Sequence, residues 1–199
     1  MVYDCYSSIS FESQRGQKLL GPASSADHRV LSETFIVQQK ASWCGVASAV
    51  TVLNADGANL TQKGFFTDEV TDIRPWCATT LAGMAIGDLS QMLEAHGAEA
   101  EVKRARSSTL EAFQAALKSN MSDPSNWLIV NYGRSVLGEQ GGGHISPISA
   151  YSEEKDMVLL LDTAGYKYPF HWVPTDSLFK AMETSDSETD KSRGWVIVR

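Results

Sequence analysis

Cys44 and Gly45 follow a polar segment and begin a stretch whose apolar residues recur at helical spacing. The expected helix covers residues 44–54 and places the thiol in its first turn. The positive end of the helix dipole and its unpaired backbone N–H groups favour a thiolate there. Gln38, six residues upstream, offers an amide that can join the N–H of Cys44 in an oxyanion hole. These residues predict a nucleophilic cysteine, although an isolated free cysteine is more often a small buried hydrophobe.

A histidine and an aspartate in the second half of the chain suit the same chemistry. His144 follows the glycines at 141–143 at the start of an expected strand, and Asp162 ends the apolar run of the next strand. Antiparallel neighbours joined by a short turn bring such side chains together. The Cys44 thiolate would then attack, the imidazole would move the proton, and the carboxylate would fix the ring. Taken singly, His144 has an ordinary explanation as a loop residue, and Asp162 as a turn or cap residue.

The elements that would hold these residues follow from apolar spacing and turn signals. Helices are expected at residues 14–20, 44–54, 86–96, 108–118 and 175–182, the fourth from a capping-box pattern at 108–111, and strands at 127–132, 144–151, 157–162 and 194–199. A helical first half followed by an antiparallel sheet is an α+β arrangement. Because no repeat or linker divides the chain, we expect one domain over residues 1–199, with residues 1–33 as an N-terminal arm packed on it.

Composition and charge exclude several classes of protein. The chain has 199 residues, 43% of them hydrophobic and 21% charged, as in ordinary globular domains. Its net charge is -7 and it has no basic run, so neither nucleic acid nor an anionic membrane surface is an expected partner. No apolar stretch approaches the ~18–20 residues that span a bilayer, and no secretion signal is visible. Cys5, Cys44 and Cys77 form no CxxC pair, which argues against a disulfide scaffold and against a zinc site.

Three stretches of the chain are typical of one known family. They are SWCGVASAVTVLN, GGGHISPISAYSEEKDMVLLLDTAGYKYPFHWVP and METSDSETDKSRGWVIVR. With these motifs the chain closely resembles the catalytic domain of phytochelatin synthases and their shorter bacterial relatives, which belong to the papain-like cysteine peptidase clan. The resemblance runs from about Phe11 to Arg199, and the block KYPFHWVP distinguishes this family from other Cys–His peptidases.

The resemblance implies a papain-like fold and a role for each matched residue. Cys44 would be the nucleophile at the start of the central helix, His144 the general acid and base, and Asp162 the orienting acid. Gln38 would be the oxyanion donor, with Gln39 as the alternative one residue on. We expect no required cofactor, and because the sequence has no HExxH or CxxC pattern we expect no metal held by the protein. In the family, cadmium or zinc assists the reaction as a metal–thiolate form of the substrate.

The resemblance also implies a binding site for the γ-glutamyl group of the substrate. In the family, an acid and an arginine hold its α-amino and α-carboxylate groups, and Asp186 and Arg193 stand at the matching places. A carboxylate suits an ammonium, and a bidentate guanidinium suits a carboxylate. Without the resemblance, both residues would be taken as ordinary loop charges. Gly143 and Trp43 are further candidates for contact with the substrate, and His171 is a candidate for either local packing or a substrate-side role.

The activity implied by the resemblance is cleavage of the Cys–Gly bond of glutathione through a γ-glutamylcysteinyl thioester on Cys44. We expect water to resolve the thioester and to give γ-glutamylcysteine. The alternative is transfer to a second glutathione, which makes a phytochelatin. Two departures from the family pattern favour hydrolysis. Gly165 stands where phytochelatin-making members commonly have an arginine, and the cysteine-rich extension of eukaryotic members is missing.

Two other classes of function are open at this level. A bacteriocin-leader-processing peptidase shares the order of cysteine, histidine and aspartate, but it needs a groove for an extended peptide, whereas Asp186 and Arg193 favour a closed pocket. A thiol or heavy-metal binding module is disfavoured because the cysteines and histidines are scattered. A reactive thiol and a glutathione substrate suit a reducing cytoplasm, although a periplasmic or exported form without its leader would have the same sequence. The family implies a homodimer.

Overall fold

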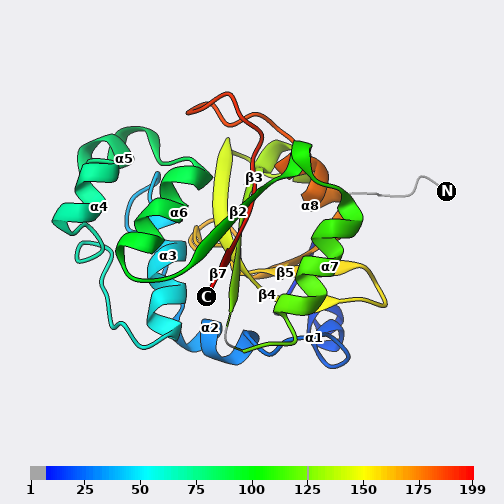
Figure 1. Cartoon of the computed structure of the whole chain (residues 1–199). Helices are drawn as coiled ribbons and strands as arrows, with labels where there is room; N and C mark the ends of the chain where they lie inside the picture. The colour runs from blue at the N-terminus through cyan, green and yellow to red at the C-terminus, as the bar shows by residue number, and fades with distance from the viewer. Residues whose placement is uncertain (1–7, 125) are drawn as a thin grey trace.

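The computed structural model describes residues 8–124 and 126–199, and one antiparallel sheet runs through this described part (Figure 1). Its strands are β1 (Ile9–Ser10), β2 (Ala100–Arg104), β3 (Trp127–Gly133), β4 (Gly143–Ser152), β5 (Met157–Leu160), β6 (His171–Pro174) and β7 (Gly194–Val198). Their order is β1-β6-β5-β4-β3-β7-β2, and all neighbours are antiparallel. His144 therefore lies on a central strand, β4, where the backbone is held firmly.

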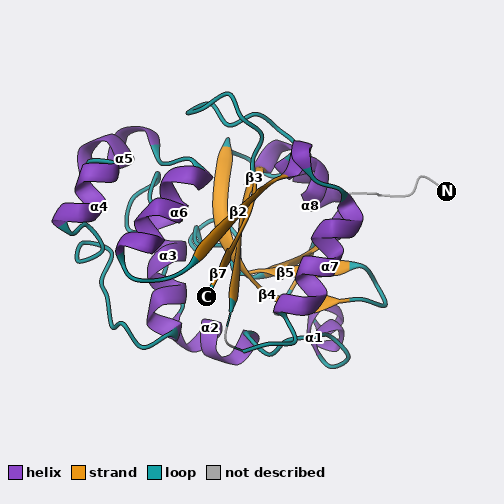
Figure 2. Cartoon of the chain, in the orientation of Figure 1, coloured by secondary structure: helices purple, strands orange, loops and turns teal. Residues whose placement is uncertain are grey.

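Helices cover both faces of the sheet, as Figure 2 shows. They are α1 (Gln14–Leu20), α2 (His28–Thr34), α3 (Cys44–Ala55), α4 (Asp68–Ile73), α5 (Trp76–Ala82), α6 (Ile86–Ala95), α7 (Leu110–Asn120) and α8 (Thr175–Met182), with short 3₁₀ turns η1 (Ala105–Ser107) and η2 (Arg134–Leu137). Helices α3 to α6 lie on one side of the sheet, and α7 and α8 lie on the other (Figure 1). Among the described residues, none of the helices has the length and apolar character needed to cross a bilayer.

The two largest of the three hydrophobic cores among the described residues lie on opposite faces of the sheet because side chains alternate along each strand. On β3, Trp127 and Ile129 belong to the core shared with α3 and α6, whereas Leu128, Val130 and Tyr132 belong to the core shared with α7 and α8. Every residue of β3 is buried. Burial on both faces explains why the sequence of this strand is almost continuously apolar. Side chains at the ends of these central strands are therefore carried by a well-packed frame.

Helix α3 packs directly on β4 and brings the cysteine to the histidine. The Ser48 hydroxyl donates a hydrogen bond to the carbonyl of Ile145 at 3.1 Å, which ties the helix to the strand. A side chain at Gly45 would place its Cβ 2.6 Å from the sulfur of Met84 and 3.3 Å from Ile145. Glycine at this position therefore lets the first turn of α3, with Cys44 at its start, lie against the sheet.

The expected α+β papain-like fold is confirmed, and each expected helix and strand is present. The bounds of α1 and α8 are as expected, and the other elements differ by one or two residues at one or both ends. The strand expected at 157–162 stops at Leu160, so Asp162 lies in the loop that follows β5. The helix expected from residue 108 begins one residue later than the capping pattern indicated. Thr109, and not Ser108, is its N-cap, and the Thr109 hydroxyl accepts the N–H of Ala112 at 3.2 Å.

The part of the chain before residue 124, expected to be helical, also contains two strands, β1 paired with β6 and β2 paired with β7. The sequence patterns also missed β6 and the short helices α2, α4 and α5. Strand β2 is an edge strand whose residues alternate between half-buried and exposed. Such a strand has no continuous apolar face, and helices of six or seven residues are too short for a clear period. These elements depend on tertiary contacts that local patterns do not reveal.

The described part of the expected N-terminal arm is fastened to the β1 edge of the sheet. The indole N–H of Trp172 donates to the carbonyl of Gly16 at 3.0 Å. Ser24 and Tyr151 exchange two backbone hydrogen bonds, of 3.0 and 2.9 Å, between the arm and β4. One domain over the entire chain stays a prediction, and Cys5 lies outside the described residues.

Asp27 is a buried carboxyl group immediately before α2. Its side chain is fully buried, and neither oxygen has a hydrogen-bond partner among the described residues. Burial, helped by the charge of Asp123, raises the pKa of Asp27 to about 8. The folded state thus keeps a proton that the unfolded chain releases near pH ~4. The folded state binds more protons than the unfolded state between these values, so the free energy of unfolding falls as pH rises across this window.

Asp27→Asn is therefore expected to stabilise the protein at about pH 8 by several degrees in Tm, with a much smaller difference at about pH 4.5. The neutral amide removes the cost of burying a charge at high pH only. Thermal melts at the two pH values measure the effect. Asp72→Asn, on the exposed side of α4, is the matched control and should show no pH-dependent difference. An equal gain for Asp27→Asn at both pH values would contradict the titration of a buried carboxyl.

Candidate active site

Cys44, His144 and Asp162 meet in the structure. Cys44 begins α3, His144 is the second residue of β4, and Asp162 follows β5. The Nε2 atom of His144 lies 2.9 Å from Oδ1 of Asp162, which leaves Nδ1 for the hydrogen bond between the ring and the Cys44 thiol. His144 is 5% exposed and Asp162 is 0% exposed. The thiol, the imidazole and the acid thus stand in the order that the sequence predicted.

The surroundings of the cysteine and the histidine favour a thiolate beside an imidazolium. Burial by itself would raise the pKa of the Cys44 thiol. Hydrogen bonds from His144 and from the backbone of Ile145 and Gly45, together with the His144 charge, outweigh burial and lower this pKa. Burial by itself would lower the pKa of His144, but its hydrogen bonds to Asp162 and to the thiolate raise it. Each group of the pair therefore stabilises the charged form of the other.

Asp162 is held by more than the histidine. Arg134, in η2, donates from Nη2 to the two carboxylate oxygens at 2.8 and 2.7 Å, and the backbone N–H of Ala164 donates to Oδ1 at 2.8 Å. Burial would raise the pKa of Asp162, but His144 and Arg134 outweigh it and lower this pKa to about 2. The carboxylate therefore stays charged wherever the thiolate pair exists. Arg134 was not predicted from the sequence. The one feature that could have indicated it is its position as a charged residue directly after an apolar strand.

Gln38 lies near the triad, but its amide group is already hydrogen-bonded to its own loop and to the loop after β5. The Nε2 atom donates to the carbonyls of Lys40 and Ala41 at 3.0 and 2.8 Å, and Oε1 accepts from the hydroxyl of Thr163 at 3.2 Å. Both amide hydrogens are engaged, so oxyanion donation by Gln38 requires one of these bonds to open. The backbone N–H of Cys44, at the helix start, has no intrahelical partner and is a second candidate donor. The oxyanion role of Gln38 stays a prediction.

A pocket of about 120 Å³ opens beside the thiol, lined by residues that include Cys44, His144, Asp186 and Arg193. Asp186 is 4% exposed and lies in the loop before β7. Its Oδ2 accepts from Nδ2 of Asn131 at 2.8 Å, and its Oδ1 accepts from the backbone N–H of residue 188 at 3.1 Å. The carboxylate is therefore fixed on the pocket wall, with acceptor capacity left for a further donor.

Arg193 carries a buried positive charge on the same wall. It is 6% exposed, and it donates hydrogen bonds to two neutral oxygens, the carbonyl of Ser185 and the hydroxyl of Thr184, the latter at 3.4 Å. Its Nε has no hydrogen-bond partner among the described residues. A side chain at Gly143 would place its Cβ 2.5 Å from Nη2 of Arg193, so glycine there makes room for the guanidinium. Such a group is well suited to bind a carboxylate.

An ion pair between Arg74 and Glu188, the Arg74–Glu188 bridge, links two walls of this pocket. Nη2 of Arg74 lies 2.7 Å from Oε2 of Glu188, and Nε donates to the carbonyl of Gly83 at 2.7 Å. Glu188 and Gly83 line the pocket from the loop before β7 and from the turn after α5. Sequence analysis did not find this bridge, because the two charges stand far apart in the chain.

Trp43 does not line this pocket. Its ring is buried and packs against Phe66 at 5.3 Å between centroids, and its indole N–H donates to the hydroxyl of Thr80 at 3.0 Å. The contact of Trp43 with the substrate stays a prediction. The side chain fixes α5 against the start of α3.

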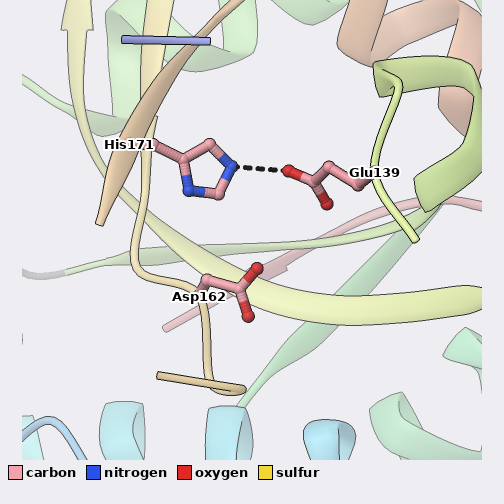
Figure 3. A group of neighbouring side chains, drawn as sticks. All are labelled: Glu139, Asp162 and His171. Carbon is pink, nitrogen blue, oxygen red and sulfur yellow. Dashed lines mark ion pairs between the residues drawn. The ribbon is translucent and has the colours of Figure 1, made fainter. Parts of the chain in front are cut away.

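Glu139, Asp162 and His171 bring three potential metal-ligating atoms within 4.8 Å of one another (Figure 3). Arg134 already binds the two carboxylates of this group, because it donates hydrogen bonds to Asp162 at 2.7 Å and to Glu139. The guanidinium supplies the positive charge that a metal ion would supply, and its N–H groups use the carboxylate lone pairs. The donor set therefore does not fit a metal ion while Arg134 is in place.

The lowered pKa of Cys44 predicts preferential alkylation. At about pH 6 we expect iodoacetamide to label Cys44 roughly tenfold faster than Cys77, although Cys77 is exposed and Cys44 is partly buried. The rate at Cys44 should fall as pH drops through its lowered pKa, because the thiolate is the nucleophile. Peptide mass spectrometry after timed labelling measures both rates. Equal rates would mean that His144 does not stabilise the thiolate.

The fold and the site together define a papain-like arrangement, in which a cysteine at the start of a helix faces a histidine on an antiparallel sheet and an acid holds the far side of the ring. A family model described as Phytochelatin synthase matches residues 5–195. The chain belongs to the phytochelatin synthase family.

Similar proteins are known from plants and from fission yeast. Glutathione gamma-glutamylcysteinyltransferase 3 of Lotus japonicus is 35% identical over 96% of this chain and 42% of its own length. Glutathione gamma-glutamylcysteinyltransferase 1 of Arabidopsis thaliana is 34% identical over 82% of this chain and 35% of its own length. The chain thus spans less than half the length of these relatives. A similar solved structure is a double glycine motif protease from an AMS/PCAT transporter in complex with the leader peptide. The match covers 81% of this chain and 86% of that protease, with 13% sequence identity and a TM-score of 0.42. Similarity at this level says nothing about chemistry.

Proposed function

We propose that this chain cleaves the Cys–Gly peptide bond of glutathione and releases γ-glutamylcysteine by hydrolysis. The name of the relatives, glutathione gamma-glutamylcysteinyltransferase, supports glutathione as the donor of the acyl group. The observation that carries the proposal is Arg193, a buried guanidinium bonded to neutral oxygens beside Cys44. A γ-linked glutamyl residue keeps both its α-carboxylate and its α-ammonium free on one carbon. Arg193 and Asp186 offer one complementary charge to each of these groups.

The triad then performs two acyl transfers. The Cys44 thiolate attacks the carbonyl carbon of the Cys–Gly bond, and His144 gives its proton to the departing amine, which leaves as glycine. The product is a thioester between Cys44 and the γ-glutamylcysteinyl group. His144 next takes a proton from water, whose oxygen attacks the thioester carbon, and γ-glutamylcysteine leaves as the thiolate is restored. Asp162 keeps the imidazole oriented in both steps.

Transfer of the acyl group to a second glutathione is the other candidate reaction, and the transferase name of the relatives favours it. An acceptor glutathione needs positive groups for its two carboxylates. Position 165, in the loop after Asp162, offers no charge for this purpose, because it is a glycine. Cadmium or zinc would enter such a transfer as the metal–thiolate form of the substrate. The absence of a charge at 165 supports hydrolysis as the main reaction.

Incubation with millimolar glutathione, with and without cadmium, tests the proposal by mass spectrometry of the products. Equimolar glycine and γ-glutamylcysteine support hydrolysis. Longer (γ-Glu-Cys)n-Gly products would establish transfer in its place, and Gly165→Arg should then raise their share. Unchanged glutathione in every condition would overturn the proposal. A double-glycine leader peptide, offered in parallel, tests the leader-peptidase alternative. A cytoplasmic location and a homodimer stay predictions.

A further inference from the structure

Behind Asp162, a chain of buried charged groups continues away from the thiol. Nη2 of Arg134 lies 2.7 Å from Asp162, Nη1 binds Glu139, and Oε1 of Glu139 lies 2.8 Å from Nε2 of His171. The Arg134 side chain is 4% exposed, that of Glu139 6% and that of His171 5%. Figure 3 shows the His171 ring directed at Glu139, with Asp162 nearby on the loop below. Negative and positive groups therefore alternate from the triad outward.

In this geometry, Glu139 and His171 can fix the orientation of Arg134 and, through it, of Asp162. The guanidinium is planar and rigid, so an anchor on Nη1 at Glu139 fixes the direction in which Nη2 meets Asp162. The His171 Nδ1 lies 2.8 Å from the carbonyl of residue 169, which can only accept, and Nε2 faces a carboxylate. With an acceptor oxygen 2.8 Å from each ring nitrogen, the positively charged form of the ring is favoured. This charge holds Glu139 in place against Arg134.

His171 has no direct route to the substrate. It is 4% exposed and does not line the pocket beside the thiol. The charged groups that act on His171 are Glu139 and Asp162. Tyr168, with its ring centroid at 6.2 Å, is the titratable neighbour on the same segment, and Arg134 lies over the Tyr168 ring. A substrate-side role does not fit this position, and a role behind the triad does.

We propose that Glu139 and His171 are positioning residues that act through Arg134 to hold Asp162 against His144. This inference rests on the proposed use of the triad as the catalytic centre. It also gives a physical role to the block KYPFHWVP, which contains His171 and distinguishes the family at the level of sequence. In this view the block supports the orientation of the imidazole, and neither residue touches glutathione.

A double-mutant cycle between His171→Gln and Asp162→Ala tests the proposal. Gln keeps an N–H donor for Glu139 but lacks the charge of the ring. In the wild-type background we expect His171→Gln to lower kcat roughly tenfold with KM changed by less than about twofold, because the pocket is untouched. The rate of Cys44 alkylation by iodoacetamide at about pH 7 should fall in parallel, and its pH profile should move upward. In the Asp162→Ala background, His171→Gln should change alkylation by less than about twofold.

The same factor of loss in both backgrounds would overturn the inference, because His171 would then not act through Asp162. Glu139→Gln is the second variant, with the same expected pattern, and it decides the question if His171→Gln does not fold by near-UV circular dichroism. His96→Gln is the matched control, since its Nε2 pairs with the carbonyl of Phe65 outside this chain of charges. Alkylation needs no substrate. Inert glutathione with an intact coupling would therefore overturn the proposed function and leave this inference standing.

Discussion

Cys44→Ala is expected to abolish cleavage of glutathione, with a loss in kcat of ~10⁴-fold or more. In the proposed reaction the thiolate forms the bond to the acyl carbon, and no other group takes that role. Release of glycine and γ-glutamylcysteine, measured by mass spectrometry, gives the rate. Intact mass of the protein after brief mixing with glutathione should show one γ-glutamylcysteinyl adduct in the wild type and none in the variant.

Cys77→Ala is the matched control for this prediction, because it removes an exposed free thiol from α5. This variant should keep full activity and the full adduct. Activity of Cys44→Ala above about one per cent of the wild type would show that the reaction does not pass through a thioester on Cys44.

Arg193→Gln is expected to lower kcat/KM for glutathione by roughly 10²- to 10³-fold, mainly through a raised KM. The change removes a buried charge that the substrate carboxylate would otherwise meet, and it leaves the triad intact. A glutathione analogue with an α-carboxamide on the glutamyl residue sharpens the test. The wild type should discriminate strongly against this analogue, and Arg193→Gln should treat both substrates nearly alike.

Lys191→Gln is the matched control for Arg193→Gln, since it removes the same charge from an exposed residue of the same loop. It should behave as the wild type with both substrates. If Arg193→Gln discriminates against the carboxamide as strongly as the wild type does, Arg193 does not bind the α-carboxylate and the assignment of the pocket fails.

The central part of the site was predictable because each group begins or follows a recognisable element. Cys44 opens a clear helical pattern, and the glycines before His144 mark the start of an apolar strand. Asp162 was expected at a strand end and lies two residues beyond the end of β5. The resemblance to a family added Asp186 and Arg193, which the structure places in the pocket beside the thiol. Local patterns alone would not have found them.

The supporting groups were not predictable from local patterns. Arg134, Glu139 and His171 come from η2, the loop after it and β6, and only the folded sheet brings them to Asp162. A charge in a sequence is usually solvated, and burial of several charges together depends on mutual neutralisation in three dimensions. The same reason explains why β2 was missed, because its pairing with β7 decides its structure more than its own alternation does.

The Arg74–Glu188 bridge has a consequence for the cell that contains the protein. A papain-type nucleophile could in principle digest other polypeptides. For cleavage, such a polypeptide would have to extend its amino-terminal side through the space beside Asp186 and Arg193, where the bridge joins the walls. Under the proposed function, glutathione ends at Asp186 and Arg193 with a free α-amino and α-carboxylate group and leaves the ion pair intact. If the proposed function holds, the bridge would favour short substrates over the interior of a polypeptide chain, and other proteins would be spared by their length and not by their sequence.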